Sequence, residues 1–268
     1  TENGIIDNSH FAYIGGRFQI RANSTFTSPN DFGMFLAIIL LIGVGLFLTA
    51  RRPKATTWLL VVSIMLSALL LTFSRSSWLA LGTGFLSVFL LRRRIKTSLL
   101  LSILFVILLS IPVLVKLDIF QRFSDTISLQ DPSAAGKLPS IINGAKFVLD
   151  HPMGIGLGMA GPRSGRFGEV EIHSENYYIL MAMEIGIIGL ILYLVIIIAT
   201  VFMLHRSYSI SNDIVKRGFT IGTLLALIGA SFGVIFIPTL QEIVISSILW
   251  FAIGMSVQRS TSNGNVKG

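Results

Sequence analysis

Residues 177–204 read YYILMAMEIGIIGLILYLVIIIATVFML, an apolar run in which Glu184 is the single charged residue. A helix of about 20 apolar residues crosses the roughly 30 Å hydrocarbon core of a bilayer. This run therefore predicts a membrane-spanning helix that is long enough to tilt or to begin above the membrane. The composition agrees, because 13% of the 268 residues are charged, against about 25% in soluble domains. With a mean hydropathy of +0.78, the chain is predicted to be a membrane protein.

Six further apolar runs lie between clusters of charged residues. They span residues 32–50, 57–73, 78–91, 97–115, 218–237 and 243–257. Each of them is long enough, or nearly long enough, to cross a bilayer as a helix. We therefore expect an all-α polytopic bundle of about seven transmembrane helices, in a single membrane domain that covers residues 1–268.

Basic residues concentrate in one set of connections between these runs. They share that set with a single acid, Asp213, and are Arg51, Arg52, Lys54, Arg92, Arg93, Arg94, Lys96, Arg206, Lys216, Arg217, Arg259 and Lys267. Cytoplasmic loops of membrane proteins carry an excess of Lys and Arg. These connections are therefore predicted to be cytoplasmic. The net charge of +8 is interpreted as an orientation signal, and no nucleic acid partner is expected.

The longest connection, residues 116–176, falls on the opposite side and is predicted to be an extracytoplasmic loop. A loop of this length is usually functional or disordered. Within it, residues 140–150 have the spacing of an amphipathic helix that lies on the membrane surface or on the bundle. The tail 1–31 is placed on the same side although no signal sequence precedes it. We therefore expect the chain to be the C-terminal part of a longer polytopic protein.

Metal and cofactor chemistry finds no support in the sequence. The chain has no cysteine, which excludes a disulfide framework, a thiolate zinc site, an iron–sulfur cluster and a cysteine nucleophile. No two histidines have metal-ligand spacing, and no Asp-rich cluster resembles a divalent-cation site. We expect no metal and no cofactor.

Arg75 lies in the segment SRSS (74–77), between two apolar runs with hardly any loop. An arginine in the middle of a membrane costs about 2.5–3.5 kcal/mol and is a functional candidate by default. Its guanidinium offers a fork of donors that suits phosphate oxygens. One interpretation is therefore an anchor for an anionic head group, and the alternative is an arginine that extends to the lipid head groups at a tight turn.

A second candidate is the segment EIHSEN (171–176), directly before the long apolar run. His173 can bind and release a proton near neutral pH, and Glu171 or Glu175 can orient it. A solvated loop histidine is the alternative. Glu184, inside the apolar run, needs a partner, and structural pairing with a base is as plausible there as catalysis.

The third candidate is the segment HPMGIGLG (151–158). Its alternating glycines, among them Gly154 and Gly156, let backbone N–H groups approach a phosphate, while a flexible turn is the simpler interpretation. The flanking cations would make the external loop an electropositive funnel. They are Lys137, Lys146, Arg163 and Arg166.

Taken in order, these segments resemble the O-antigen ligase and polymerase superfamily. NSTFTSPND (23–31) is similar to the family's Gly-Thr-Phe-x-Asn-Pro-Asn, and FSRSSW (73–78) to its Thr-x-Ser-Arg-Gly turn. HPMGIGLG is similar to the family's His-Pro-x-x-Gly-x-Gly, and EIGIIG (184–189) to its Glu-x-Gly-x-x-Gly. In two places the chain departs from the family pattern. Lys137 stands where an arginine is usual, and Ser174 and Glu175 separate His173 from Asn176.

The resemblance implies an enzyme of the bacterial inner membrane with a GT-C-like fold, whose active site is on the periplasmic face. The donor would be a glycan linked to undecaprenyl diphosphate, and the acceptor a lipid A-core or a growing glycan, with membrane lipids around the protein. His173 or Glu175 would be the base, and Arg75 would neutralise the diphosphate in a metal-independent single displacement. The implied substrate-binding residues are Arg75, Lys137, Arg163, Arg166, Gly154, Gly156 and Asn176.

Two other classes of function remain open on the sequence: a transporter or flippase of lipid-linked sugars, and a non-catalytic membrane scaffold. For the enzyme, we predict that Arg75, Lys137, 154–158 and 173–176 form one site at the outer mouth of the bundle. The side chains of His173 and Arg75 would then lie about 10 Å apart, one sugar-phosphate plus the reach of a base.

Overall fold

The structure, a computed structural model, describes residues 10–14, 17–49, 55–91, 137–161 and 173–257. The predicted run 97–115 lies outside these residues. The helices are α1 (Pro29–Thr49), α2 (Ala55–Leu71), α3 (Arg75–Leu91), α7 (Lys137–Asp150), α8 (Tyr177–Ile210), α9 (Ile214–Gly233) and α10 (Ile243–Val257), with a 3-10 turn, η3 (Thr239–Gln241).

The prediction of an all-α membrane protein is confirmed. In the described part of the chain, α1, α8 and α9 are long and apolar enough to cross a membrane, judged by length and composition. Shorter apolar helices cover Leu60–Leu71, within α2, and Ile243–Val257, which is α10. Since the backbone of a helix satisfies its own hydrogen bonds, helices are the form in which such segments are stable in lipid.

The centre of the bundle is α9, which packs against α1, α3, α8 and α10. Its buried residues include Leu224 and Leu225. Gly45 of α1 faces Gly222 of α9 so closely that a Cβ on Gly45 would collide with the backbone nitrogen of Gly222. Small residues of this kind let helix backbones approach in a membrane, where packing rather than water exclusion drives association.

α8 is bent sharply at Gly186, whose φ of 74° and ψ of 175° are not helical. We call residues 177–185 the short arm and residues 187–210 the long arm. The rings of Tyr177 and Tyr193, one on each arm, lie 5.9 Å apart, whereas 16 residues of straight helix would separate them by about 24 Å. The sequence predicted a continuous helix here, and that part of the prediction is wrong.

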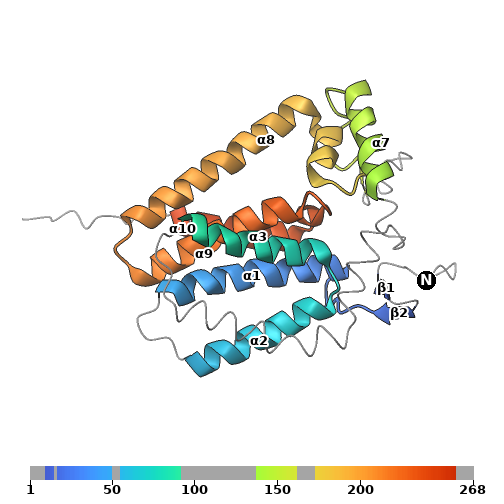
Figure 1. Ribbon diagram of the computed structural model, residues 1–268. Helices are drawn as coiled ribbons and strands as arrows, with labels where there is room; N and C mark the ends of the chain where they lie inside the picture. Colours follow the sequence, from blue (N-terminus) through green and yellow to red (C-terminus); the bar gives the residue numbers. More distant parts are fainter. Residues whose placement is uncertain (1–9, 15–16, 50–54, 92–136, 162–172, 258–268) are drawn as a thin grey trace, which may run out of the picture.

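Two hydrogen bonds hold the short arm against the end of α9. The backbone N–H of Tyr177 donates to the carbonyl oxygen of Val234 at 3.0 Å. The hydroxyl of Tyr178 donates to the carbonyl oxygen of Ser231 at 2.7 Å. The long arm begins at the bend, away from α9, and approaches the bundle at an angle until it ends where α9 begins (Figure 1).

The sequence predicted an amphipathic helix for residues 140–150, and α7 (Lys137–Asp150) confirms this prediction. It runs across the direction of α1, α3 and α9, at the end of the bundle where α1 and α3 begin (Figure 1). Phe147 and Val148 on one face of α7 pack against Leu180 and Met183 of the short arm. α7 therefore lies on the bundle with one face.

The N-terminal segment contains an antiparallel hairpin that we did not predict. It consists of β1 (Phe11–Ile14) and β2 (Arg17–Ile20), with Phe11 opposite Ile20 and Ile14 opposite Arg17. A sequence signal was available, since Gly15 and Gly16 separate two short runs of strand-forming residues, and two glycines are a common hairpin connection.

The helix ends fall into two groups. α1, α3, α8 and α10 end, and α2 and α9 begin, at one end of the bundle, whereas the hairpin and α7 lie at the other (Figure 1). Arg206, Lys216 and Arg217 belong to the first end. The structure thus places these basic residues and Arg75 at opposite ends of the bundle. That the end with the basic residues is cytoplasmic stays a prediction.

Candidate active site

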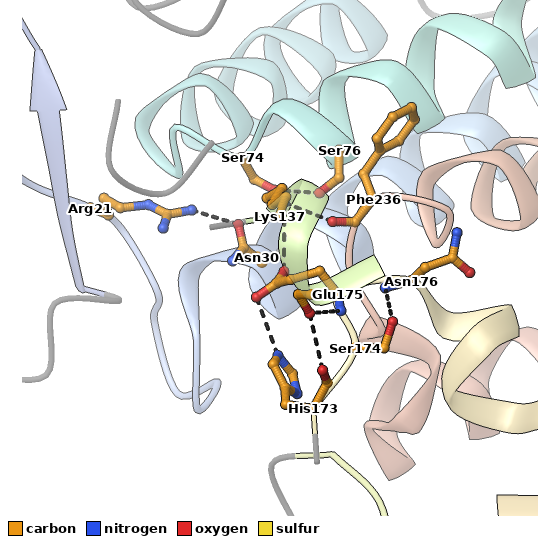
Figure 2. A network of polar contacts seen from close by, with 11 residues as sticks. Arg21, Asn30, Ser74, Ser76, Lys137, His173, Ser174, Glu175, Asn176 and Phe236 are labelled. Carbon is orange, nitrogen blue, oxygen red and sulfur yellow. Dashed lines mark hydrogen bonds and ion pairs between the residues drawn. The ribbon is translucent and has the colours of Figure 1, made fainter. Parts of the chain in front are cut away.

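Glu175 stands between a histidine and a lysine at the α7 end of the bundle (Figure 2). Its Oε1 lies 3.3 Å from Nε2 of His173, and its Oε2 lies 3.6 Å from Nζ of Lys137. The imidazole is exposed, while Lys137 and Glu175 are half-buried. We call His173, Glu175 and Lys137 the central cluster.

The segment that carries His173 and Glu175 is held in place by α7. The hydroxyl of Ser140 donates to the carbonyl oxygen of His173 at 3.0 Å and accepts from the backbone N–H of Glu175 at 3.1 Å. The next residue, Asn176, is the N-cap of α8, where its Oδ1 accepts from the N–H groups of Tyr178 and Ile179 at 2.9 and 3.1 Å. An N-cap satisfies backbone donors that a helix leaves free. Asn176 therefore has a structural role, and its predicted contact with substrate stays a prediction.

Lys137 connects the cluster to the turn after α9 and lies in a positive field. Its Nζ donates to the carbonyl oxygen of Phe236 at 2.7 Å. Burial lowers the pKa of Lys137, and the charges of Arg75 and Arg21 lower it further, against the opposing effect of Glu175. Lys137 is thus close enough to two other cations, Arg75 and Arg21, to be affected by their charges, an arrangement that suits an anionic ligand.

Glu175 is held in its ionised form. Burial alone would raise its pKa, but the hydrogen bond from His173 and the charge of Lys137 outweigh burial, so the pKa lies below the ordinary value. A carboxylate with a low pKa is a weak base near neutral pH. Because Nε2 of His173 faces this carboxylate, we assign its proton to Nε2, which leaves Nδ1 as the basic nitrogen of the neutral ring.

Arg75 is the first residue of α3, after a tight turn in which Phe73 has a φ of +50°. Hydroxyl groups fix this turn: Oγ of Ser74 lies 2.8 Å from Oγ of Ser77 and 3.2 Å from Oγ of Ser76. The side chain of Arg75 is half-buried, and its charge reaches Lys137. Arg75 thus lies close enough to Lys137 to affect its charge, and that Arg75 and the central cluster form one site stays a prediction.

Arg21 is a residue near the site that the sequence analysis did not single out. It is buried, its Nε donates to the carbonyl oxygen of Thr72 at 2.8 Å, and its Nη2 donates to Oδ1 of Asn30 at 2.6 Å. Arg21 thereby ties the segment after the hairpin to the turns that begin α1 and α3 (Figure 2). The available signal was its position just before the segment NSTFTSPND, where the family resemblance begins.

Residues 60–194, half of the chain, match the sequence family described as O-antigen ligase. The chain belongs to the O-antigen ligase family. The matched region contains Arg75, Lys137, the segment 173–176 and the bend of α8, whereas Arg21 lies outside it.

A curated relative agrees with the family. The chain is 28% identical over 204 residues to an O-antigen polymerase of Salmonella muenchen, a match that covers 70% of this chain and 49% of the relative. The chain thus spans about half the length of the curated relative. No solved structure matches it.

In this member of the O-antigen ligase family, the glycine-rich segment 151–158 packs against the bend of α8. The N–H of Gly154 donates to the carbonyl oxygen of His151, and the N–H of Gly156 to that of Glu184, both at 2.9 Å. A Cβ on Gly154 would lie 2.5 Å from the carbonyl oxygen of Glu184. These glycines therefore allow close backbone packing, and their predicted contact with phosphate stays a prediction.

The glycine-rich segment and the central cluster occupy opposite ends of α7. Lys137 begins this helix of 14 residues, which is about 20 Å long, and Gly154 follows its end. Glu184 also lies beside the glycines, where the backbone N–H groups of Gly158 and Ala160 donate to its carboxylate. Within the described ranges, the partners of Glu184 are thus backbone N–H groups rather than a basic side chain. That both ends of α7 act in one site stays a prediction.

Arg163 and Arg166 lie outside the described residues. Among the residues that the structure describes, no group of three or more His, Asp or Glu side chains is placed to hold a metal ion.

Proposed function

We propose that this chain forms part of a membrane glycosyltransferase that moves a glycan from undecaprenyl diphosphate to a sugar hydroxyl. The acceptor would be a lipid A-core, as in a ligase, or a growing glycan, as in a polymerase. Family membership supports glycan transfer. The observation that carries the proposal is the contact of His173 with Glu175, and of Glu175 with Lys137, beside Arg75.

In this proposal the cations bind the donor. The diphosphate carries the negative charge that Arg75 and Lys137 are placed to neutralise as it leaves. Arg75 can contact two phosphate oxygens at once, while Lys137 acts as a point charge. Arg163 and Arg166 are proposed as additional contacts.

His173 is the proposed base, and Glu175 is a positioning residue. Nδ1 of His173 takes the proton of the acceptor hydroxyl, whose oxygen bonds to the anomeric carbon while the bond from that carbon to the diphosphate oxygen breaks. Undecaprenyl diphosphate leaves with the electron pair of that bond, and the anomeric configuration inverts. Glu175, an acceptor held in place by Ser140 and Lys137, stabilises the imidazolium that forms.

The proposed site faces the periplasm, and the protein lies in the inner membrane. Support for this orientation comes from Arg206, Lys216 and Arg217, which lie at the end of the bundle opposite α7, because an excess of basic residues is typical of the cytoplasmic side.

Substitution of Arg75 tests the donor site. Arg75→Lys keeps the charge but loses the fork of donors, so transfer should fall by about 10²-fold, the typical effect of losing one preorganised donor. Arg75→Ala should lower both transfer and donor binding further. The assay is transfer from a defined undecaprenyl-diphosphate glycan by the complete protein in proteoliposomes, with Arg206→Ala, at the other end of the bundle, as the matched control. Wild-type turnover by Arg75→Ala would show that Arg75 only extends to the lipid head groups.

Substitution of Glu175 separates the two candidate bases. The lowered pKa of Glu175 keeps it ionised at neutral pH, so its effect on His173 is present there and is lost only as the pH falls through that lowered pKa. Glu175→Gln removes the charge that favours the imidazolium. Because the imidazolium that forms during transfer loses this stabilisation, kcat in the same transfer assay should fall by about 10²-fold, with part of the activity retained.

The control for this experiment is Asp150→Asn, on the exposed end of α7, which should leave kcat unchanged. Complete loss of transfer by Glu175→Gln at every pH, with activity retained by His173→Ala, would make Glu175 the base.

A further inference from the structure

The surface of α7 is divided into three sectors. Successive residues of a helix are rotated by about 100°, so residues three, four and seven positions apart share a face. The face toward the short arm is built from Gly144, Phe147 and Val148, and the half-buried Ile141 shares this face by its spacing. The other two sectors are exposed.

One exposed sector is entirely apolar. Leu138, Ile142, Ala145 and Leu149 fall within about 60° of one another, and all four are exposed, Leu138 at 63% and Leu149 at 75%. We call these four residues the apolar stripe. A neighbouring exposed sector consists of Pro139, Asn143, Lys146 and Asp150, and we call it the polar sector. Contact of such an apolar band with water is unfavourable, so an exposed band of this kind indicates a surface that binds a partner.

The apolar stripe continues onto the membrane-spanning surface of α8. Beyond Leu149, the side chains of Met153 and Leu157 are also exposed, at 78% and 73%. This loop is joined to the beginning of the long arm, where the N–H of Ile187 donates to the carbonyl oxygen of Pro152 at 2.9 Å. Ile188, the next residue of the long arm, is exposed. The long arm is an apolar helix of spanning length, so its exposed side chains lie in hydrocarbon.

The direction of α7 suits the boundary between lipid and water. It runs across the spanning helices at one end of the bundle (Figure 1), which is the direction of a helix lying in the plane of a membrane. We infer that the apolar stripe, with Met153 and Leu157, is a lipid-binding surface that dips into the membrane interface while the polar sector faces water.

The charges on α7 fit this occupant. Lys146 belongs to the polar sector but is only one turn away from both Ile142 and Leu149. From that edge its long side chain reaches the level of lipid phosphates, as is usual for lysines at interfaces. The stripe itself contains no charged residue, which is what contact with acyl chains requires.

This inference gives α7 a part in the proposed function, on which the following consequence rests. Lys137 and Ser140 in the first turn of α7 hold Glu175 and His173. A lipid-bound α7 therefore sets the depth of the central cluster relative to the phosphates of membrane lipids, where the diphosphate of a lipid-linked donor also lies.

Spin labelling tests the inference without any substrate, so its failure is distinct from failure of the proposed enzyme. These 268 residues contain no cysteine, so once any cysteine elsewhere in the complete protein is replaced by serine, Ile142→Cys, Leu149→Cys and Met153→Cys can each carry one nitroxide. Asn143→Cys and Asp150→Cys, on the same helix, are the matched controls. The complete protein is reconstituted in vesicles of phosphatidylethanolamine and phosphatidylglycerol, and collisions with oxygen, which enters the bilayer, are compared with collisions with a water-soluble nickel chelate.

The expected result is a severalfold higher ratio of oxygen to nickel collisions at positions 142, 149 and 153 than at positions 143 and 150. Preferential collision with nickel at all five positions would place the apolar stripe in water and overturn the inference. Protection of the stripe positions from both reagents would show that protein, not lipid, covers the stripe, and would overturn it as well.

Discussion

Transfer by the His173→Ala variant is expected to fall by about 10²–10⁴-fold, the range that general-base assistance contributes. The imidazole of His173 is exposed in the wild type, and its Nε2 lies 3.3 Å from Oε1 of Glu175. In the proposed mechanism the other ring nitrogen, Nδ1, accepts the proton of the acceptor hydroxyl. Donor binding should remain nearly intact, because the proposed contacts to the diphosphate come from Arg75 and Lys137. The two measurements are the transfer rate in proteoliposomes and the affinity of the protein for the donor.

His151→Ala is the matched control for this variant. His151 lies on the same side of the bundle and is exposed, but it stacks on Phe147 with ring centroids 4.2 Å apart and makes no contact with Glu175. We expect near wild-type transfer from it. If His173→Ala turns over normally while His151→Ala does not, the proposed base is the wrong histidine.

Gly186→Ala is expected to disrupt the fold around the site. Gly186 has a positive φ, which residues with a side chain rarely adopt. A Cβ added at this position would also lie 2.6 Å from the backbone oxygen of Pro152. Such a backbone conformation costs about 1–3 kcal/mol for a residue other than glycine, and the collision with backbone adds to this cost. The thermal midpoint should fall by about 5–10 °C, and transfer should be lost, because the short arm begins at the segment that carries His173.

Gly82→Ala provides the comparison for this experiment. Gly82 is a helical glycine of α3, and a Cβ there would meet nothing within 4 Å. Alanine is the better helix former, so this variant should be as stable as the wild type or slightly more so. Wild-type stability and transfer by Gly186→Ala would contradict the packing of segment 151–158 against the bend.

Both experiments depend on α7, which joins the two regions that they perturb. At one end Lys137 and Ser140 hold the segment 173–176, and at the other the chain after α7 packs on the bend of α8. A disturbance at Gly186 is therefore expected to reach His173 through α7 as well as through the short arm.

The sequence alone was sufficient for the class of the protein and for most of its helices. Apolar runs of spanning length predict helices because a lipid-exposed backbone must satisfy its own hydrogen bonds, and this property depends on each segment by itself. The same holds for the amphipathic pattern of 140–150. The order of short motifs indicates the family, and the sequence alone predicts Arg75, Lys137, His173 and Glu175 as candidate site residues.

Only the tertiary structure decided how these residues meet. Glu175 contacts Lys137 at the beginning of α7, although the rest of that helix and the segment after it separate them in the sequence. Lys137 donates to Phe236, which is 99 positions away, and Arg21 reaches the turn before α3 from the N-terminal segment. The bend at Gly186 was not predicted, because a glycine inside an apolar run is compatible with a continuous helix. The positive φ of Gly186 accompanies close packing against segment 151–158, which is distant in the sequence. Contacts between distant segments depend on the packing of the whole bundle, whereas the periodicity of a sequence reports only on each segment alone.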